Sequence, residues 1–106
     1  MELPSPCPFG NVELSSERER HIALRHPDLL PIHGARLAEA LADPDSVRSS
    51  VRGRNARLFT KWFGDVRGGK HVVVVVASEG EPVCHRVVTA YIARRLSEGM
   101  VEWQRD

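Results

Sequence analysis

Apolar and polar residues alternate with a period of two through most of the second half of the chain, which predicts β-strands. Four strands are expected, over residues 46–51, 56–63, 71–78 and 83–92. Turn-forming residues separate these strands at positions 52–55, 64–69 and 79–82. Because the links are short, we expect the four strands to pair as an antiparallel meander rather than through crossover connections.

The chain before these strands has a helical pattern. Ser16 and Glu19 have the spacing of a capping box, and Pro27 disfavours a longer helix, so residues 16–26 are predicted to be helical. Residues 34–42 carry an apolar stripe and predict a second helix. Two helices followed by four strands predict an α+β fold, in which both helices pack on one face of a four-stranded antiparallel sheet.

The length of 106 residues predicts a single domain with one core. Residues 1–10 contain three prolines and are expected to form a mobile leader before the domain of residues 11–106. Residues 9–14 predict a short edge strand, and Trp103 is expected to dock on the core from a short tail. Because the sequence has neither a signal peptide nor an apolar run of membrane-spanning length, it predicts a cytoplasmic protein without a membrane partner.

The composition is that of a folded soluble protein, with 42% apolar and 27% charged residues. All but two of the 15 basic residues are arginine. Arginine presents a planar fork of donors that suits phosphate and carboxylate, although a GC-rich coding bias explains the same excess. Cys7 and Cys84 do not form a pair with zinc-binding spacing, so no metal or other cofactor is expected.

The last predicted strand separates two kinds of side chain. Side chains alternate between the faces of a strand, so Val88, Ala90 and Ile92 are expected to be buried beneath the helices. Thr89 and Tyr91 then lie on the opposite face, which is expected to be open to solvent. Both residue types also favour strands for structural reasons alone.

The first helix supplies further candidates for chemistry. Arg18, His21 and Arg25 are spaced by three and four residues and form one basic stripe. His26 directly precedes Pro27, where an imidazole often satisfies free carbonyls at a helix end. His21 and His26 therefore have either a role in proton transfer or a purely structural one.

Three motifs in this order resemble a known family. They are HI-x-x-RHP at residues 21–27, Asp-Pro-Asp-x-Val at residues 43–47 and Thr-Ala-Tyr at residues 89–91. The chain from Val12 to Trp103 resembles small phage-associated and bacterial domains of the barnase–EndoU–colicin–RelE-like nuclease superfamily. Such domains have helices followed by a curved antiparallel sheet of about four strands.

The resemblance implies metal-independent cleavage of RNA, commonly in toxins that block translation. The family's catalytic positions fall on His21, His26, Thr89 and Tyr91. The basic residue of its middle strand falls on Lys61, and Arg25 and Lys61 are expected to hold the phosphate. The chain departs from the family at Arg20, where a tryptophan is often found.

Cleavage of RNA without a metal uses the 2′-hydroxyl of the substrate as the nucleophile. It requires a base near that hydroxyl, an acid at the leaving oxygen and cations around the phosphate. RNA is the expected partner, together with an antitoxin or immunity protein, and no oligomeric state is predicted. The alternative is a catalytically inactive module of the same fold that binds RNA or a protein.

Overall fold

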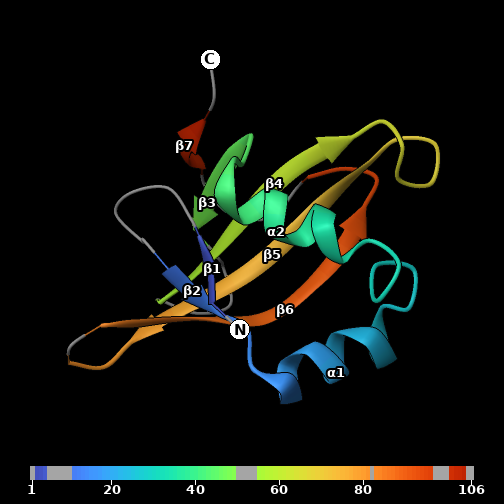
Figure 1. Ribbon diagram of the computed structural model, residues 1–106. Coiled ribbons are helices and arrows are strands. Elements are labelled where there is room, and N and C mark those ends of the chain that lie inside the picture. Colours follow the sequence, from blue (N-terminus) through green and yellow to red (C-terminus); the bar gives the residue numbers. More distant parts are fainter. Residues whose placement is uncertain (1, 5–10, 50–54, 82, 97–100, 105–106) are drawn as a thin grey trace.

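The computed structural model describes residues 2–4, 11–49, 55–81, 83–96 and 101–104, in which two helices pack on one sheet (Figure 1). The helices are α1 (Ser16–Arg25) and α2 (Gly34–Ala42). The strands are β1 (Glu2–Pro4), β2 (Asn11–Glu13), β3 (Ser46–Ser49), β4 (Ala56–Phe63), β5 (Lys70–Glu79), β6 (Cys84–Ala93) and β7 (Val101–Gln104). Their order in the sheet is β1-β2-β6-β5-β4-β3-β7.

The predicted four-stranded antiparallel sheet is wrong in both size and type, although the fold is α+β. The four expected strands form the centre, and each pairs antiparallel with its neighbour. β2 adds to this centre in parallel with β6, so the sheet is mixed. β2 lies within the short strand expected at residues 9–14, but β1 pairs with it, so it is not an edge strand. β1 and β7 have only three or four residues each, which is too short for a period of two to be recognised.

The two ends of the chain extend the sheet at opposite edges. Residues 2–4, within the expected leader, form β1 and pair with β2. The end of the chain returns across the sheet and pairs as β7 with β3. Trp103 is part of β7 and 45% exposed, so the expectation that it docks on the core is wrong.

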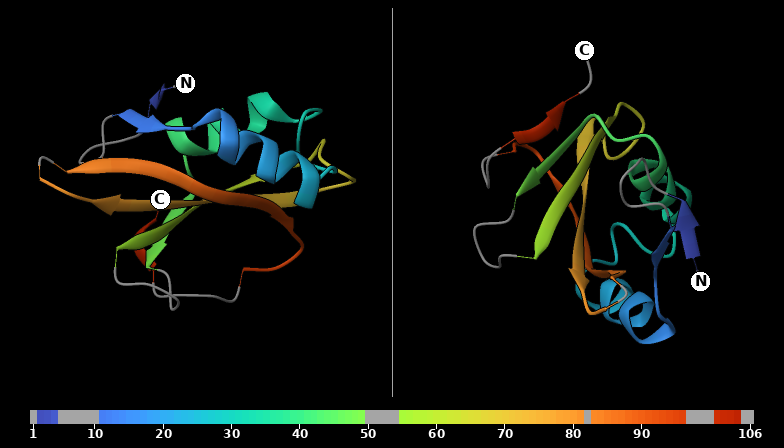
Figure 2. Two further views of the ribbon diagram at one scale, coloured as in Figure 1. Left: turned by 90° about the horizontal axis from the view of Figure 1, so that it is seen from below. Right: turned by 90° about the vertical axis from the view of Figure 1, so that its left-hand side faces the viewer.

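Both predicted helices are present and lie on the same side of the sheet (Figure 2). α1 begins at Ser16 as predicted, but its N-cap is Ser15 rather than Ser16, and the Ser15 hydroxyl accepts from the backbone N–H of Arg18 at 3.1 Å. The helix ends at Arg25, with His26 as the C-cap. α2 packs on β4 and β5, whereas α1 lies along β6.

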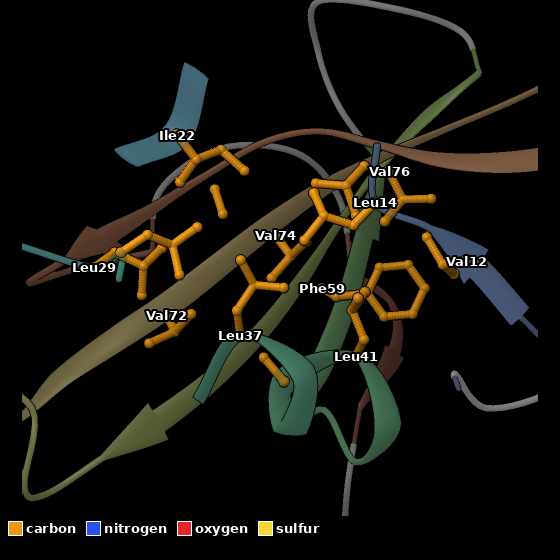
Figure 3. Packing of buried hydrophobic residues seen from close by; sticks show 14 of the residues in the cluster. Val12, Leu14, Ile22, Leu29, Leu37, Leu41, Phe59, Val72, Val74 and Val76 are labelled. Atoms are coloured by element: carbon orange, nitrogen blue, oxygen red, sulfur yellow. The ribbon is translucent and has the colours of Figure 1, made fainter. Parts of the chain in front are cut away.

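The core fills the space between the helices and the sheet. Figure 3 shows that apolar side chains from α1, α2, β2, β4 and β5 point into one cluster, in which Phe59 of β4 and Leu41 of α2 face each other. Both side chains are fully buried. On β5 the buried members of this cluster are Val72, Val74 and Val76, as expected for the inner face of a strand with period two.

A β-bulge changes the alternation in β6. Val75 and Val76 of β5 pair with Thr89 and Val87, so Val88 is an extra residue without an opposite partner. Val87 therefore packs in the core with 1% exposure, whereas Val88 is 37% exposed. The expectation that Val88 is buried beneath the helices is wrong, while Ala90 is buried and Ile92 packs partly against the core.

The bulge gives a direct mutational test of this register. Val87→Ala is expected to lower the free energy of unfolding by about 2 kcal/mol, because it removes two buried methyl groups from a close-packed site. Val88→Ala is expected to change it by less than about 0.5 kcal/mol, because the side chain lies at the surface. Urea denaturation of the two variants measures both values, and a larger loss for Val88→Ala would contradict the observed register.

Candidate functional site

The face of the sheet opposite the helices, here called the outer face, is hollowed rather than flat and open. One row of side chains crosses four strands from Ser46 through Thr60 and Val73 to Tyr91. Thr60 and Val73 in the middle of this row are almost fully buried. The expectation of a solvent-open face is therefore wrong at its centre, because long side chains and the chain after β6 cover it.

A cavity of about 140 Å³ lies over this row and is here called the Tyr91 pocket. Its polar lining consists of Arg48, Thr60, Tyr91 and Arg95, and its apolar lining of Leu58, Val73, Ala93 and Leu96. Arg95 and Leu96 directly follow β6, and β7 lies at the opposite edge of the sheet, paired with β3. Among these lining residues two are arginine and none is acidic, so the pocket favours an anion.

The side chain of Arg48 is the strongest indication that the pocket binds an anion. Its Nε atom is buried and has no hydrogen-bond partner within the described part of the chain. A buried donor without a partner costs about 1–3 kcal/mol, and more when the group is charged. Such a group in a native structure requires an explanation, and an oxyanion ligand that accepts from Nε supplies one.

The floor of the pocket is polar but already satisfied. The Thr60 and Ser46 hydroxyls form a buried hydrogen bond to each other, and Thr60 also approaches the carbonyl of Ser46. These two hydroxyls therefore need no ligand. Thr60 lines the pocket two strands from Tyr91, with Val73 between them in the row.

Tyr91 also contacts the end of α1. Its ring lies 6.1 Å from the imidazole of His26, centroid to centroid, with the two planes tilted by 43°. His26 reaches Tyr91 because α1 follows β6, where the Arg18 guanidinium donates to the Val88 carbonyl at 3.2 Å. One side of Tyr91 therefore faces the imidazole of His26 and the other faces the arginine-lined pocket.

A second histidine lies beside the pocket on the outer face. His71 pairs across strands with Ala93, a lining residue, and is thus a diagonal neighbour of Tyr91, within reach of an aromatic side chain. Burial lowers the pKa of His71; the negative charge of Asp45 opposes this and the positive charge of Arg48 adds to it. The lowered pKa leaves His71 neutral at neutral pH, the state required of a proton acceptor.

The pKa of His71 also predicts how stability depends on pH. In the unfolded chain a histidine titrates near 6.5, so below that pH the unfolded state binds more protons than the folded state. The stability that His71 contributes in its neutral form is therefore fully present above about pH 6.5. It is lost as the pH falls from 6.5 through the lower pKa that His71 has in the folded state. Between pH 7 and pH 5, the free energy of unfolding is therefore expected to decrease less in His71→Gln than in the unaltered protein. Urea titrations at each pH measure this difference. Parallel curves for the two proteins would contradict this expectation.

The structure brings together some of the site residues that the sequence predicted. Thr89 is half-buried and lies on the outer face in the row next to Tyr91. His21 is half-buried on α1, one turn beyond Arg18 and so on the side of the helix that faces β6. Arg25 is exposed in the last turn of α1. Of these expected residues, His26 and Tyr91 form the pair whose contact is established.

Lys61 is not part of this group. It lies on the helix-side face of β4, between Phe59 and Phe63, and its side chain is only 14% exposed. Its ammonium group lies 3.4 Å from an Asp43 oxygen and 3.6 Å from an Asp45 oxygen. Lys61 is therefore paired with two carboxylates and lies on the opposite face of the sheet from Tyr91.

Three residues of the site were not identified from the sequence, namely Arg48, His71 and Arg95. The period of two within β5 places His71 on the face of Val73 and Val75, a signal that was present but not used. Arg48 joins the site through the pairing of β3 with β4, which a local pattern does not specify. Arg95 follows the last predicted strand and reaches the pocket because the chain turns back there.

A larger groove of about 540 Å³ lies between α1 and α2 but is less suited to chemistry. It is lined mainly by apolar residues such as Ala23, Leu30 and Leu37, and its one lining cation, Arg20, is accompanied by Glu19. Within the described ranges, no three or more histidine, cysteine or carboxylate side chains are grouped to hold a metal ion. No helix there is long and apolar enough to cross a membrane.

Comparison with known proteins gives no match, whether to a family model, a curated protein sequence or a solved structure. The function is therefore inferred from the residues and geometry of the Tyr91 pocket and its surroundings.

Proposed function

We propose that the protein is an endoribonuclease that cleaves RNA by attack of the 2′-hydroxyl, with the scissile phosphate bound in the Tyr91 pocket. The observation that carries this proposal is the buried Nε of Arg48, which has no hydrogen-bond partner among the described residues, in a pocket whose tyrosine contacts a histidine. A cation with an unused Nε donor and two imidazoles near one phenol are the groups that this reaction requires. The resemblance of the sequence motifs to a superfamily of ribonucleases agrees with the proposal.

In this proposal the two arginines of the pocket hold the phosphate. The Nε of Arg48 donates to one non-bridging oxygen, and the exposed guanidinium of Arg95 binds the second from the solvent side. Both oxygens gain negative charge as the phosphorane forms. Donors fixed beforehand in a partly buried pocket stabilise that charge more than water does.

The histidines on either side of Tyr91 are assigned to proton transfer. His71, neutral because of its lowered pKa, accepts the proton of the 2′-hydroxyl as the 2′-oxygen forms its bond to phosphorus. The bond from phosphorus to the 5′-oxygen breaks, and His26 in its protonated form supplies a proton to that oxygen. Tyr91 donates a hydrogen bond to the phosphate from between them. The products are a 2′,3′-cyclic phosphate and a free 5′-hydroxyl.

The test is cleavage of a 5′-labelled single-stranded RNA in excess EDTA under single-turnover conditions. We expect cleavage of RNA, no cleavage of DNA of the same sequence, and a loss of about 10²-fold for Tyr91→Phe, which removes a hydrogen-bond donor to the phosphate. The new 3′ ends should resist alkaline phosphatase until mild acid opens the cyclic phosphate. His85→Gln, which alters a histidine at the distant end of β6, serves as the matched control and should retain the rate.

Several outcomes would overturn this mechanism. Cleavage that depends on added Mg²⁺, equal cleavage of DNA, or an unchanged rate in Tyr91→Phe would each do so. If RNA is bound but not cleaved at any enzyme concentration, the protein is an RNA-binding module of this fold rather than a nuclease.

A further inference from the structure

An exposed tryptophan stands on the outer face next to the Tyr91 pocket. Trp62 of β4 is 52% exposed, although an indole is among the largest apolar groups a protein can bury. We propose that the Trp62 ring is a stacking platform for the nucleobase adjacent to the phosphate in the Tyr91 pocket. This inference rests on the proposed function and specifies the substrate as single-stranded RNA with an unpaired base at that position.

The register of the sheet places Trp62 beside the pocket, at the end where Ala93 lines it. It pairs across strands with His71, and His71 pairs in turn with the lining residue Ala93. Thr60 in the pocket floor lies two residues earlier on the same strand and face, roughly 7 Å away along the strand. That separation is comparable with the distance from a phosphate to the base of its own nucleotide, so one nucleotide spans from the pocket to the ring.

Two glycines at the β4–β5 hairpin leave room for the indole. A Cβ atom built at Gly64 would lie 3.3 Å from the Trp62 ring, and one built at Gly69 would lie 2.8 Å from it. The φ angle of +106° at Gly69 already favours glycine, but Gly64 has no such backbone reason. One side of the ring therefore rests on the glycines of the hairpin, and the remaining ring surface is available to solvent.

The backbone of Trp62 is held in place as well. Its N–H donates to an Asp45 carboxylate oxygen at 2.9 Å, which fixes this part of β4 beyond the end of its pairing with β3. A ring held between a fixed backbone and the hairpin loses little conformational entropy when a base stacks on it. Preorganisation of this kind increases affinity without any additional contact.

The surroundings of Trp62 favour a nucleobase over an apolar protein partner. Its same-face neighbours along and across the strands, Thr60 and His71, are polar, so the ring does not belong to a continuous apolar patch. An exposed aromatic ring beside an arginine-lined pocket is the combination by which proteins bind single-stranded nucleic acids, with cations for the backbone and rings for the bases.

The experiment uses a 2′-O-methyl RNA oligonucleotide, which can bind but cannot be cleaved by 2′-hydroxyl attack. The full chain carries Trp103→Phe so that Trp62 is its one tryptophan. We expect binding to quench Trp62 fluorescence, and Trp62→Ala to weaken binding measured by anisotropy of a labelled oligonucleotide by about tenfold. Trp62→Phe should retain most of the affinity, because a smaller ring still stacks.

A series of oligonucleotides with one abasic site identifies the base concerned. At one position, the abasic oligonucleotide should bind the unaltered protein more weakly than the intact oligonucleotide does. The Trp62→Ala variant should bind these two oligonucleotides with equal affinity. Equal affinity of Trp62→Ala and the unaltered protein, or additive losses at every position, would overturn the stacking role even if RNA is cleaved. Quenching and a tenfold loss without cleavage would instead support the platform and overturn the nuclease.

Discussion

Replacing Arg48 by methionine is expected to lower the rate of RNA cleavage by about 10²–10³-fold, the effect of removing one donor from a preorganised oxyanion site. The methionine side chain retains much of the apolar stem but has neither the charge nor the Nε donor. Arg48→Lys should recover only part of the rate, because an ammonium group lacks the planar fork of the guanidinium. Single-turnover cleavage in EDTA measures all three proteins.

Stability separates a role in binding from a structural role at this position. Because the Nε of Arg48 is buried without a described partner, its removal is expected to leave the free energy of unfolding unchanged or higher. Arg57→Met is the matched control, since Arg57 pairs with Glu102 at 3.0 Å and lies outside the Tyr91 pocket. Equal rates for Arg48→Met and the unaltered protein would remove Arg48 from the site. Unfolding of Arg48→Met would show that the guanidinium serves the fold instead.

Phe59→Ala is expected to lower the free energy of unfolding by about 3–5 kcal/mol, a large part of the stability of a domain of this size. The ring is fully buried at the centre of the core, where it faces Leu41 of α2 (Figure 3). Close packing allows only partial collapse around the space that the ring leaves. The loss includes both the transfer of the ring from water and the cavity that remains.

Two controls accompany this variant. Phe59→Leu keeps an apolar group of intermediate size and is expected to cost clearly less than alanine. Leu24→Ala removes an apolar side chain that is 77% exposed on α1, so its effect should be within about 0.5 kcal/mol. A cost of under about 1 kcal/mol for Phe59→Ala would contradict the core described here.

Long periodic segments were predicted well because their side chains report burial locally. The helices at residues 16–26 and 34–42 and the central strands follow from the spacing of apolar residues and the flanking prolines. The bulge at Val88 was not predictable, because Val87 and Val88 are identical side chains and only the pairing with β5 decides which is buried. One inserted residue reverses the alternation, which sequence periodicity treats as continuous.

The edge strands β1 and β7 show a different limit. Segments of three or four residues carry too little pattern, and their pairing depends on which sheet edge lies nearby after the centre has formed. β7 is the clearest example, since its pairing with β3 is a long-range contact. The same return of the chain brings Arg95 to the Tyr91 pocket, so the error in the fold and the omission in the site have one cause.

Residues of the candidate site that belong to the sequence motifs were predictable. Residues that join the site only through pairing between distant strands were not. His26 and Tyr91 were chosen through the family resemblance, and the structure places their rings in contact. Arg48 lies 43 residues before Tyr91 in the sequence and joins it only through three successive strand pairings. Lys61 is a site residue that the family resemblance implies, but it faces the helices, because its position in the alternation of β4 is opposite to that of Thr60.

The most direct test of the central claim is to map where an RNA phosphate binds. Backbone amide NMR shifts would be recorded while a dinucleotide with 2′-deoxy at the scissile position, which cannot be cleaved, is added to the protein. The largest changes are predicted at Arg48, His71, Tyr91 and Arg95, around the Tyr91 pocket. Changes confined to the groove between α1 and α2, or no change at millimolar dinucleotide, would contradict the assignment of this pocket as the RNA site.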